Sequence, residues 1–157
     1  MKNFLKIMTL AALLLAGVGC QPIGGDEGKP QPTPELEVTP NTIAGSWMLA
    51  MRNDQKPAEG SYVYIDFVRS DRTFTLYQNV DSFGNRTLTG RYFIYVDEEV
   101  GVSVIRGEYD HGAGEWNHRY IVESLTHNTM RLVAKDNSAD VCTYVRADIP
   151  AEILDGE

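Results

Sequence analysis

Short runs of alternating apolar and polar residues, separated by turn residues, constrain the fold of this chain more than any other feature. The run 61–69, for example, is apolar at every second position through Val63, Ile65 and Phe67. Side chains along a strand alternate between the two faces of a sheet, so a period of two indicates half-buried strands. About eight such runs are present, at residues 43–52, 61–69, 73–78, 86–96, 100–108, 119–125, 129–135 and 141–147.

The connections between several of these runs are short, as at residues 70–72, 126–128 and 135–137. Short links join sequence neighbours as antiparallel hairpins, and eight successive hairpin strands can close into an up-and-down barrel without exposed edges. No sustained helical period interrupts the pattern. A helical turn is expected at 149–154, where Pro150 argues against a long helix. The predicted fold class is therefore all-β, an antiparallel up-and-down barrel.

The N-terminal twenty residues have the pattern of a secretion signal. Lys2 and Lys6 precede an uncharged apolar run at 7–18, which is followed by small residues and Cys20. This order of basic start, apolar stretch and small residues is typical of signal peptides. The apolar run is short for a transmembrane helix, which needs about 20 residues. We expect a signal peptide at 1–19 rather than a membrane span.

The segment around the expected cleavage site, Gly19-Cys20 after Leu15-Ala16-Gly17-Val18, resembles the lipobox of bacterial lipoproteins, although Gly17 stands where those proteins usually have Leu. The resemblance implies a diacylglycerol on Cys20. Gln21, where inner-membrane lipoproteins often have Asp, points to the outer membrane, on its periplasmic or its outer side. The acidic pair Asp26-Glu27 is similar to the export signal of Bacteroidota surface lipoproteins, and a solvated linker is the alternative interpretation.

The expected organisation has four parts. Residues 1–19 form the signal peptide, and residues 20–41 are a lipidated Cys and a tether with five of the seven prolines. Pro and Gly at this density favour an extended spacer over a core. Residues 42–149 form the barrel domain and residues 150–157 a tail. If Cys20 is acylated, Cys142 has no partner for a disulfide.

The chain carries a formal net charge of −8. Removal of the signal peptide would also remove Lys2 and Lys6 and make the mature chain more acidic. Binding to nucleic acid requires clustered Lys and Arg to contact phosphates, and no such cluster is present. The same acidity argues against adhesion to an anionic membrane through side chains. The membrane is therefore an expected partner only through the lipid on Cys20.

The Gly45-Ser46-Trp47 triplet at the start of the first run resembles the Gly-x-Trp motif that opens the first strand of lipocalins. That resemblance implies that Trp47 closes one barrel end and that Arg146, on the final run, packs across it. The phrase Tyr120-x-Val122-x-Ser124-Leu125-Thr126-x-Asn128-Thr129-Met130-x-Leu132 is similar to one near the C-terminus of compact lipocalin-like domains in Bacteroidota lipoproteins. The resemblance covers about residues 42–147.

Two functions of different classes remain open. The first is binding of a small apolar or amphipathic ligand inside the barrel, with these candidate contacts: Trp47, Tyr62, Tyr64, Tyr92, Tyr95 and Arg146. The second is a protein-interaction module, such as an anchored inhibitor, adaptor or assembly accessory. Its loops would carry the contacts, with Phe83, His111 and Trp116 as candidates.

We expect no enzymatic activity, no cofactor and no metal site. The three histidines lie in separate loops or loop edges, without a spacing that would put two imidazoles on one strand face. Cys142 lies in the middle of a run, where a buried free Cys is commonly part of the core. Asp66 stands among apolar neighbours, and the alternation turns it outward. No nucleophile with an adjacent base is recognisable.

Overall fold

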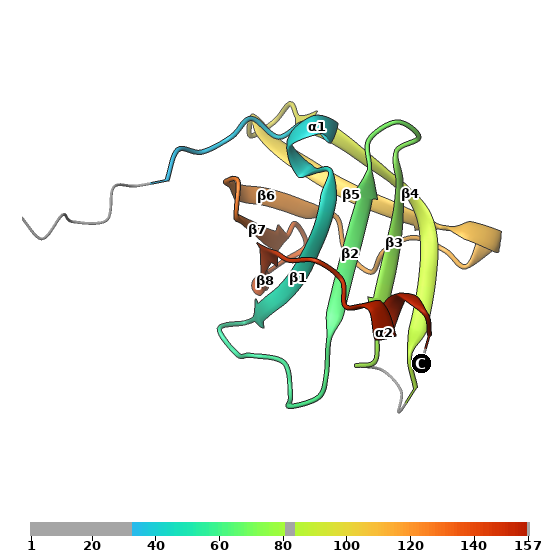
Figure 1. Ribbon diagram of the computed structural model, residues 1–157. Coiled ribbons are helices and arrows are strands. Elements are labelled where there is room, and N and C mark those ends of the chain that lie inside the picture. Colours follow the sequence, from blue (N-terminus) through green and yellow to red (C-terminus); the bar gives the residue numbers. More distant parts are fainter. Residues whose placement is uncertain (1–32, 81–83, 157) are drawn as a thin grey trace, which may run out of the picture. The chain divides into compact units, whose positions relative to one another are not determined.

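Eight antiparallel strands form a closed barrel in which each strand pairs with its neighbours in sequence and the last returns to the first (Figure 1). The structure is a computed structural model, and it describes residues 33–80 and 84–156. The strands are β1 (Gly45–Arg52), β2 (Val63–Val68), β3 (Thr73–Gln78), β4 (Arg86–Asp97), β5 (Val102–Tyr109), β6 (Tyr120–Leu125), β7 (Thr129–Ala134) and β8 (Asn137–Arg146). The predicted all-β, up-and-down barrel is confirmed.

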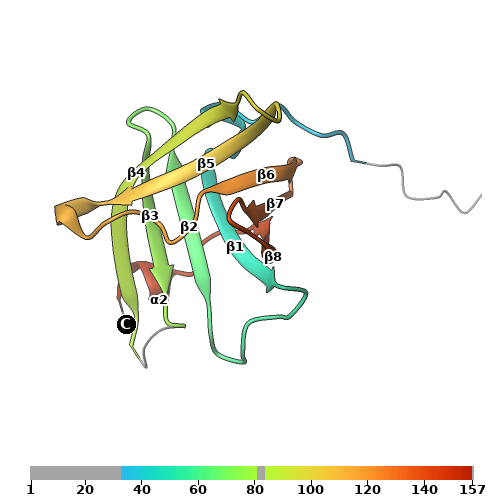
Figure 2. The same ribbon diagram turned by 180° about the vertical axis from the view of Figure 1, so that it is seen from behind.

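Strands β1 to β4 form one wall of the barrel, and β5 and β6 cross behind them at a steep angle (Figures 1 and 2). Side chains alternate between the interior and the outer face as the period of two predicts. A cluster of buried residues forms the core of the interior: Ile43, Trp47, Ile65, Phe67, Phe74, Tyr92, Ile105, Val122, Leu125, Met130, Leu132 and Cys142. Burial of this apolar surface is the main stabilising contribution to the fold.

The barrel is preceded by a short helix, α1 (Pro40–Ile43), where the sequence predicted the start of a strand. Thr39 caps the helix, because its side chain accepts a hydrogen bond from the Thr42 amide while the Thr42 side chain accepts one from the Thr39 amide. Pro40 follows at the first helical position, where its missing N–H costs nothing. The strand therefore begins only at Gly45.

The folded part extends further toward the N-terminus than residue 42, the expected domain boundary. Leu36 and Val38 pack against the core cluster, and the Leu36 amide donates a hydrogen bond of 2.7 Å to the Leu125 carbonyl. The final segment of the predicted tether is thus part of the domain.

A bulge in β1 changes which side chains enter the barrel. Pairing with β8 runs through Leu49↔Tyr144 and then resumes at Met51↔Thr143, which leaves Ala50 as an extra residue. Strict alternation from Trp47 predicted Met51 on the inner face. Instead Met51 is 39% exposed. The same shift pairs Arg52 with Cys142 and brings Arg52 to the mouth of the barrel cavity.

The C-terminal half of the domain differs from the prediction in one strand start. β8 begins at Asn137 rather than 141, because Ala134 and Asn137 pair across the two-residue turn Lys135-Asp136. The helical turn expected after Pro150 is present as α2 (Ala151–Leu154). It lies against the outer side of the wall formed by β2, β3 and β4 (Figures 1 and 2).

Candidate functional site

One end of the barrel is sealed by Trp47. Its side chain is completely buried, and its indole Nε1 donates a hydrogen bond of 2.8 Å to the carbonyl of Ile43 in α1. An indole N–H needs such a partner when it is buried. Helix α1 thus both covers this end and satisfies the one polar atom of the ring.

Arg146 completes the seal from β8, directly opposite Trp47 in the strand register. Its guanidinium carbon lies 3.8 Å from the centroid of the Trp47 ring. Nη2 donates a hydrogen bond of 2.9 Å to the Thr42 carbonyl, and Nη1 donates to the Ala44 carbonyl. The guanidinium therefore ties the last strand to α1 while it stacks on the indole.

Gly45 is the residue that allows this arrangement. Its φ is +97°, a backbone conformation that L side chains rarely adopt, and a Cβ at this position would lie 2.8 Å from Nη1 of Arg146. The spacing Gly45-x-Trp47 therefore has a physical cause in this chain, since the glycine gives the guanidinium its place beside the ring.

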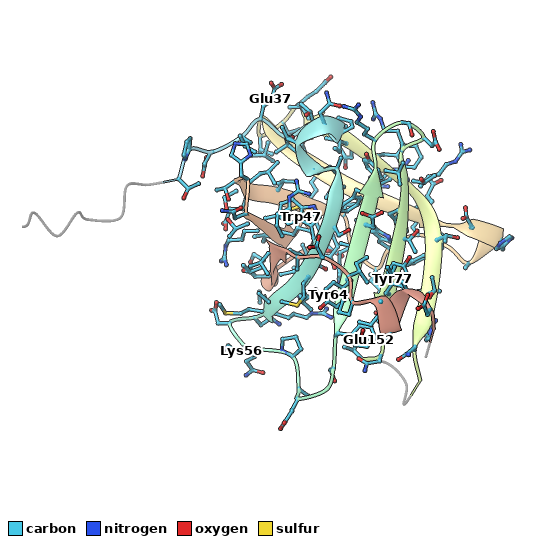
Figure 3. All side chains as sticks on the ribbon, viewed as in Figure 1. Glu37, Trp47, Lys56, Tyr64, Tyr77 and Glu152 are labelled. Carbon is cyan, nitrogen blue, oxygen red and sulfur yellow. The ribbon has the colours of Figure 1, made fainter. Side chains whose placement is uncertain are left out.

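The opposite end of the barrel encloses a cavity of about 500 Å³ that opens to solvent. Apolar side chains from four strands line it: Leu49, Val63, Ile65, Phe67, Leu76, Met130 and Leu132. Polar side chains at the strand ends and loops surround the opening: Arg52, Asn53, Gln55, Lys56, Gln78 and Asn117. Figure 3 shows Trp47 and Lys56 toward different ends of β1. The barrel is solid at the Trp47 end and hollow at the other.

Trp116 forms part of the cavity wall, although it follows the η1 turn (Asp110–Gly112) between β5 and β6. Its ring centroid lies 5.1 Å from that of Phe74 and 6.4 Å from that of Tyr120. The ring lies over Gly107, where a Cβ would approach it to 2.2 Å. The missing side chain at Gly107 thus provides the space that Trp116 occupies.

A second wall of the cavity carries phenols and a thiol from β5, β6 and β8. It is formed by Tyr109, Tyr120, Cys142 and Tyr144. Burial raises the pKa of Cys142 to about 11 and raises the pKa values of Tyr120 and Tyr144 above their usual range. These groups stay protonated and uncharged at neutral pH, so the wall offers hydrogen-bonding groups without charge.

An ion-pair network lies at the cavity mouth. Arg52 donates from Nε and Nη2 to the two carboxylate oxygens of Asp140, each at 3.0 Å, and this pairing raises the pKa of Arg52. His118 bridges to the same carboxylate, with Nε2 3.6 Å from Asp140, and its Nδ1 lies 2.7 Å from Asp136. The hydrogen bond with His118 lowers the pKa of Asp136.

The predicted ligand contacts lie elsewhere, and none of the six is among the residues that line this cavity. Trp47 and Arg146 are brought together, as the lipocalin resemblance implied, but they form the sealed end. Tyr92 points inward and is completely buried beside Phe67, with a ring-centroid distance of 5.0 Å. Its ring is packing rather than a free surface.

The other three predicted tyrosines are not on the inner face. Tyr64 alternates with the inward Val63 and Ile65, and its ring centroid lies 5.9 Å from that of Tyr62. Figure 3 shows Tyr64 near Glu152 of α2, whose charge acts on its phenol. Tyr95 lies on the opposite face of β4 from Tyr92 by the same alternation.

The residues expected in the protein-interaction loops are also separated. His111 is exposed in η1, with a left-handed φ of 59°. Trp116, expected at an exposed loop, packs into the barrel because Gly107 leaves room for it. Phe83 and the expected lipid-bearing Cys20 lie outside the described residues.

The structure thus assigns the cavity wall to residues that were not predicted, above all Tyr120 and Tyr144. A signal for Tyr144 was present: it is two residues from Arg146, and a period of two places both on one face. The position of Arg52 at the cavity mouth had no such signal, because it depends on the bulge at Ala50.

Comparisons with known proteins identify no relative: no protein-family model, no curated protein and no solved structure matches the chain. Within the described residues, no helix has the length and apolar character needed to cross a bilayer. The architecture that the structure shows is an antiparallel barrel of eight strands, sealed at one end and hollow at the other.

Proposed function

We propose that this barrel binds a small apolar or amphipathic molecule in the cavity opposite Trp47. The observation that carries the proposal is the cavity of about 500 Å³, with an apolar interior and a polar rim. Sites for small molecules are commonly concave, mostly apolar and of about 300–1,000 Å³. The polar rim around Arg52 and Lys56 suits a ligand whose polar end reaches solvent.

Within this proposal the domain is a lipocalin-like lipoprotein of the outer membrane in the Bacteroidota. The support is the Gly45-x-Trp47 motif with Arg146 stacked on the ring, together with the lipobox-like sequence that ends at Cys20. Replacement of Cys20 by Ala is expected to abolish labelling with radioactive palmitate and to release the protein from the membrane fraction. Unchanged labelling would exclude a lipid on Cys20.

Ligand binding is tested with N-phenyl-1-naphthylamine, a neutral dye whose fluorescence rises in apolar surroundings. The wild-type protein is expected to bind it saturably. Leu76→Trp fills the cavity from β3 and is expected to weaken binding at least ~10-fold, which corresponds to about 1.4 kcal/mol. Thr75→Trp, the matched control, adds the same ring on the outer face of β3 and is expected to leave the affinity unchanged.

The outcome separates this function from the protein-interaction alternative. Absence of saturable dye binding to the folded wild-type protein would contradict the cavity proposal. Equal binding by the two tryptophan variants would place the dye on the surface and would contradict it as well. The packing of the Trp116 ring against Phe74 supports a role in the cavity wall more than one in docking.

A further inference from the structure

Two phenol groups in the cavity wall have no hydrogen-bond partner among residues 33–80 and 84–156. Tyr120 on β6 and Tyr144 on β8 both line the cavity, and no hydrogen bond to either hydroxyl exists among the described residues. Among the described residues, the side-chain oxygen that is both fully buried and without a partner is that of Tyr62, and not that of Tyr120 or Tyr144. The hydroxyls of Tyr120 and Tyr144 therefore border accessible space in the cavity.

The two phenols belong to one surface. The registers Leu49↔Tyr144 and Tyr120↔Ala134 place both on inward-facing positions of neighbouring β6, β7 and β8. Besides burial, Cys142 and Arg52 both affect the pKa of each phenol, so both phenols lie within electrostatic range of the same two groups. A hydroxyl that is removed from bulk water without a partner is unfavourable, and a bound molecule that supplies the partner gains affinity from it.

The surroundings determine what kind of partner fits. Arg52, the cation that acts on both phenols, already donates two hydrogen bonds to Asp140. A ligand carboxylate at this wall would lose its hydration without gaining a free cation, and it would lie near the Asp140 charge. Neutral phenols also donate hydrogen bonds to an uncharged oxygen, which is far less costly to bury than a carboxylate.

We infer that the ligand is an uncharged molecule with an apolar body and an acceptor oxygen, a carbonyl above all, that accepts hydrogen bonds from Tyr120 and Tyr144. This inference rests on the proposed function and specifies the ligand class for the same cavity. The apolar body lies against Leu49, Leu76 and Leu132, and the oxygen faces the phenol wall.

The test compares two probes of nearly equal size, hexanophenone and hexylbenzene, which differ by one carbonyl oxygen. Each displaces N-phenyl-1-naphthylamine from the wild-type protein and from Tyr120→Phe and Tyr144→Phe. In each variant the ratio of ketone to hydrocarbon affinity is expected to fall ~3–10-fold, the amount one hydrogen bond contributes, while hexylbenzene binds as before. Tyr95→Phe, which removes an outward phenol, is the control and leaves the ratio unchanged.

A second measurement reports the hydrogen bond directly. The infrared carbonyl band of bound hexanophenone is expected to lie at lower frequency in the wild-type protein than in the Tyr144→Phe variant. If both probes bind but the ratio and the band are the same in all variants, the inference is wrong and the cavity function stands. Tighter binding of 6-phenylhexanoate than of the ketone also overturns it. If neither probe displaces the dye, both proposals fail.

Discussion

The guanidinium of Arg146 lies over the indole of Trp47 at the junction of the last and first strands, with 3.8 Å between the guanidinium carbon and the ring centroid. Because this contact joins β8 to β1, it lies where the barrel closes. The guanidinium also donates to two carbonyls near α1, those of Thr42 and Ala44. One side chain thus links barrel closure, the sealed end and the helix that covers it.

Replacing Arg146 by Lys keeps the positive charge but removes the planar group that stacks and donates in two directions. We expect the variant to lose about 2 kcal/mol of unfolding free energy, since hydrogen bonds to charged groups and a cation–π contact each contribute on this order. Urea denaturation followed by Trp fluorescence measures the loss. Arg91→Lys, at an exposed position of β4, is the control; an equally small effect at both sites would contradict the role of Arg146.

Gly45→Ala is expected to destabilise the barrel for two reasons that can be separated. The φ of +97° is strained for alanine, and the new Cβ would lie 2.8 Å from Nη1 of Arg146. We expect a loss of about 2–4 kcal/mol. Gly101→Ala is the matched control, because its φ is +69° but nothing lies within 4 Å of the added Cβ; it should cost about 1–2 kcal/mol.

The steric part of the Gly45 effect is expected to depend on the arginine. In an Arg146→Ala background, Gly45→Ala should cost only the backbone strain, about as much as Gly101→Ala does in the wild-type protein. A double-mutant cycle measured by urea denaturation gives this coupling. Strictly additive effects would show that Gly45 and Arg146 act independently.

The strands and their order were predictable because both depend on local signals. Alternation fixes which residues form strands, and the short links at 70–72 and 126–128 leave antiparallel neighbours as the simple solution. The contact between Trp47 and Arg146 followed from a resemblance, since nothing in the spacing of two residues 99 positions apart requires it. The barrel register then confirmed it.

The cavity wall was harder to predict because inner-face assignment fails at bulges. Alternation counted from Trp47 places Arg52 outside, and the extra residue Ala50 reverses this. Whether a barrel is filled or hollow depends on which side chains occupy its interior. Trp116, for example, fits there because Gly107 has no side chain. Such contacts join positions on different strands or loops and leave no periodic signal in the sequence.

Gly107→Ala is expected to expel Trp116 from the barrel. The added Cβ would approach the indole to 2.2 Å, and the ring cannot move deeper because Phe74 lies against it. Since Trp47 stays buried, a shift of the emission to longer wavelength reports Trp116 alone, with a stability loss of about 1–3 kcal/mol. Gly84→Ala, whose added Cβ has no atom of the described residues within 4 Å, is the control. Unchanged emission from a folded Gly107→Ala protein would contradict the described packing.

Cys142 is expected to react slowly with iodoacetamide at neutral pH. Its alkylation rate should increase over a more alkaline range than is usual for a cysteine. The residue is 6% exposed, and burial raises the pKa of its thiol to about 11. The reactive species is the thiolate, so the rate should rise ~10-fold per pH unit from 8 to about 11. In a Cys20→Ala chain Cys142 is the only thiol, and mass spectrometry measures its alkylation.

The denatured chain is the control for this pH profile, since there the rate should level off near pH 9. The same shift has a consequence for stability. Because the folded state holds the proton more tightly, the thiol favours folding fully below pH 9, and this contribution is lost as the pH rises toward 11. A ligand in the cavity should slow the alkylation at every pH, because Cys142 lines its wall. A folded protein whose rate levels off at pH 9 would show that Cys142 is open to solvent and would contradict the described wall.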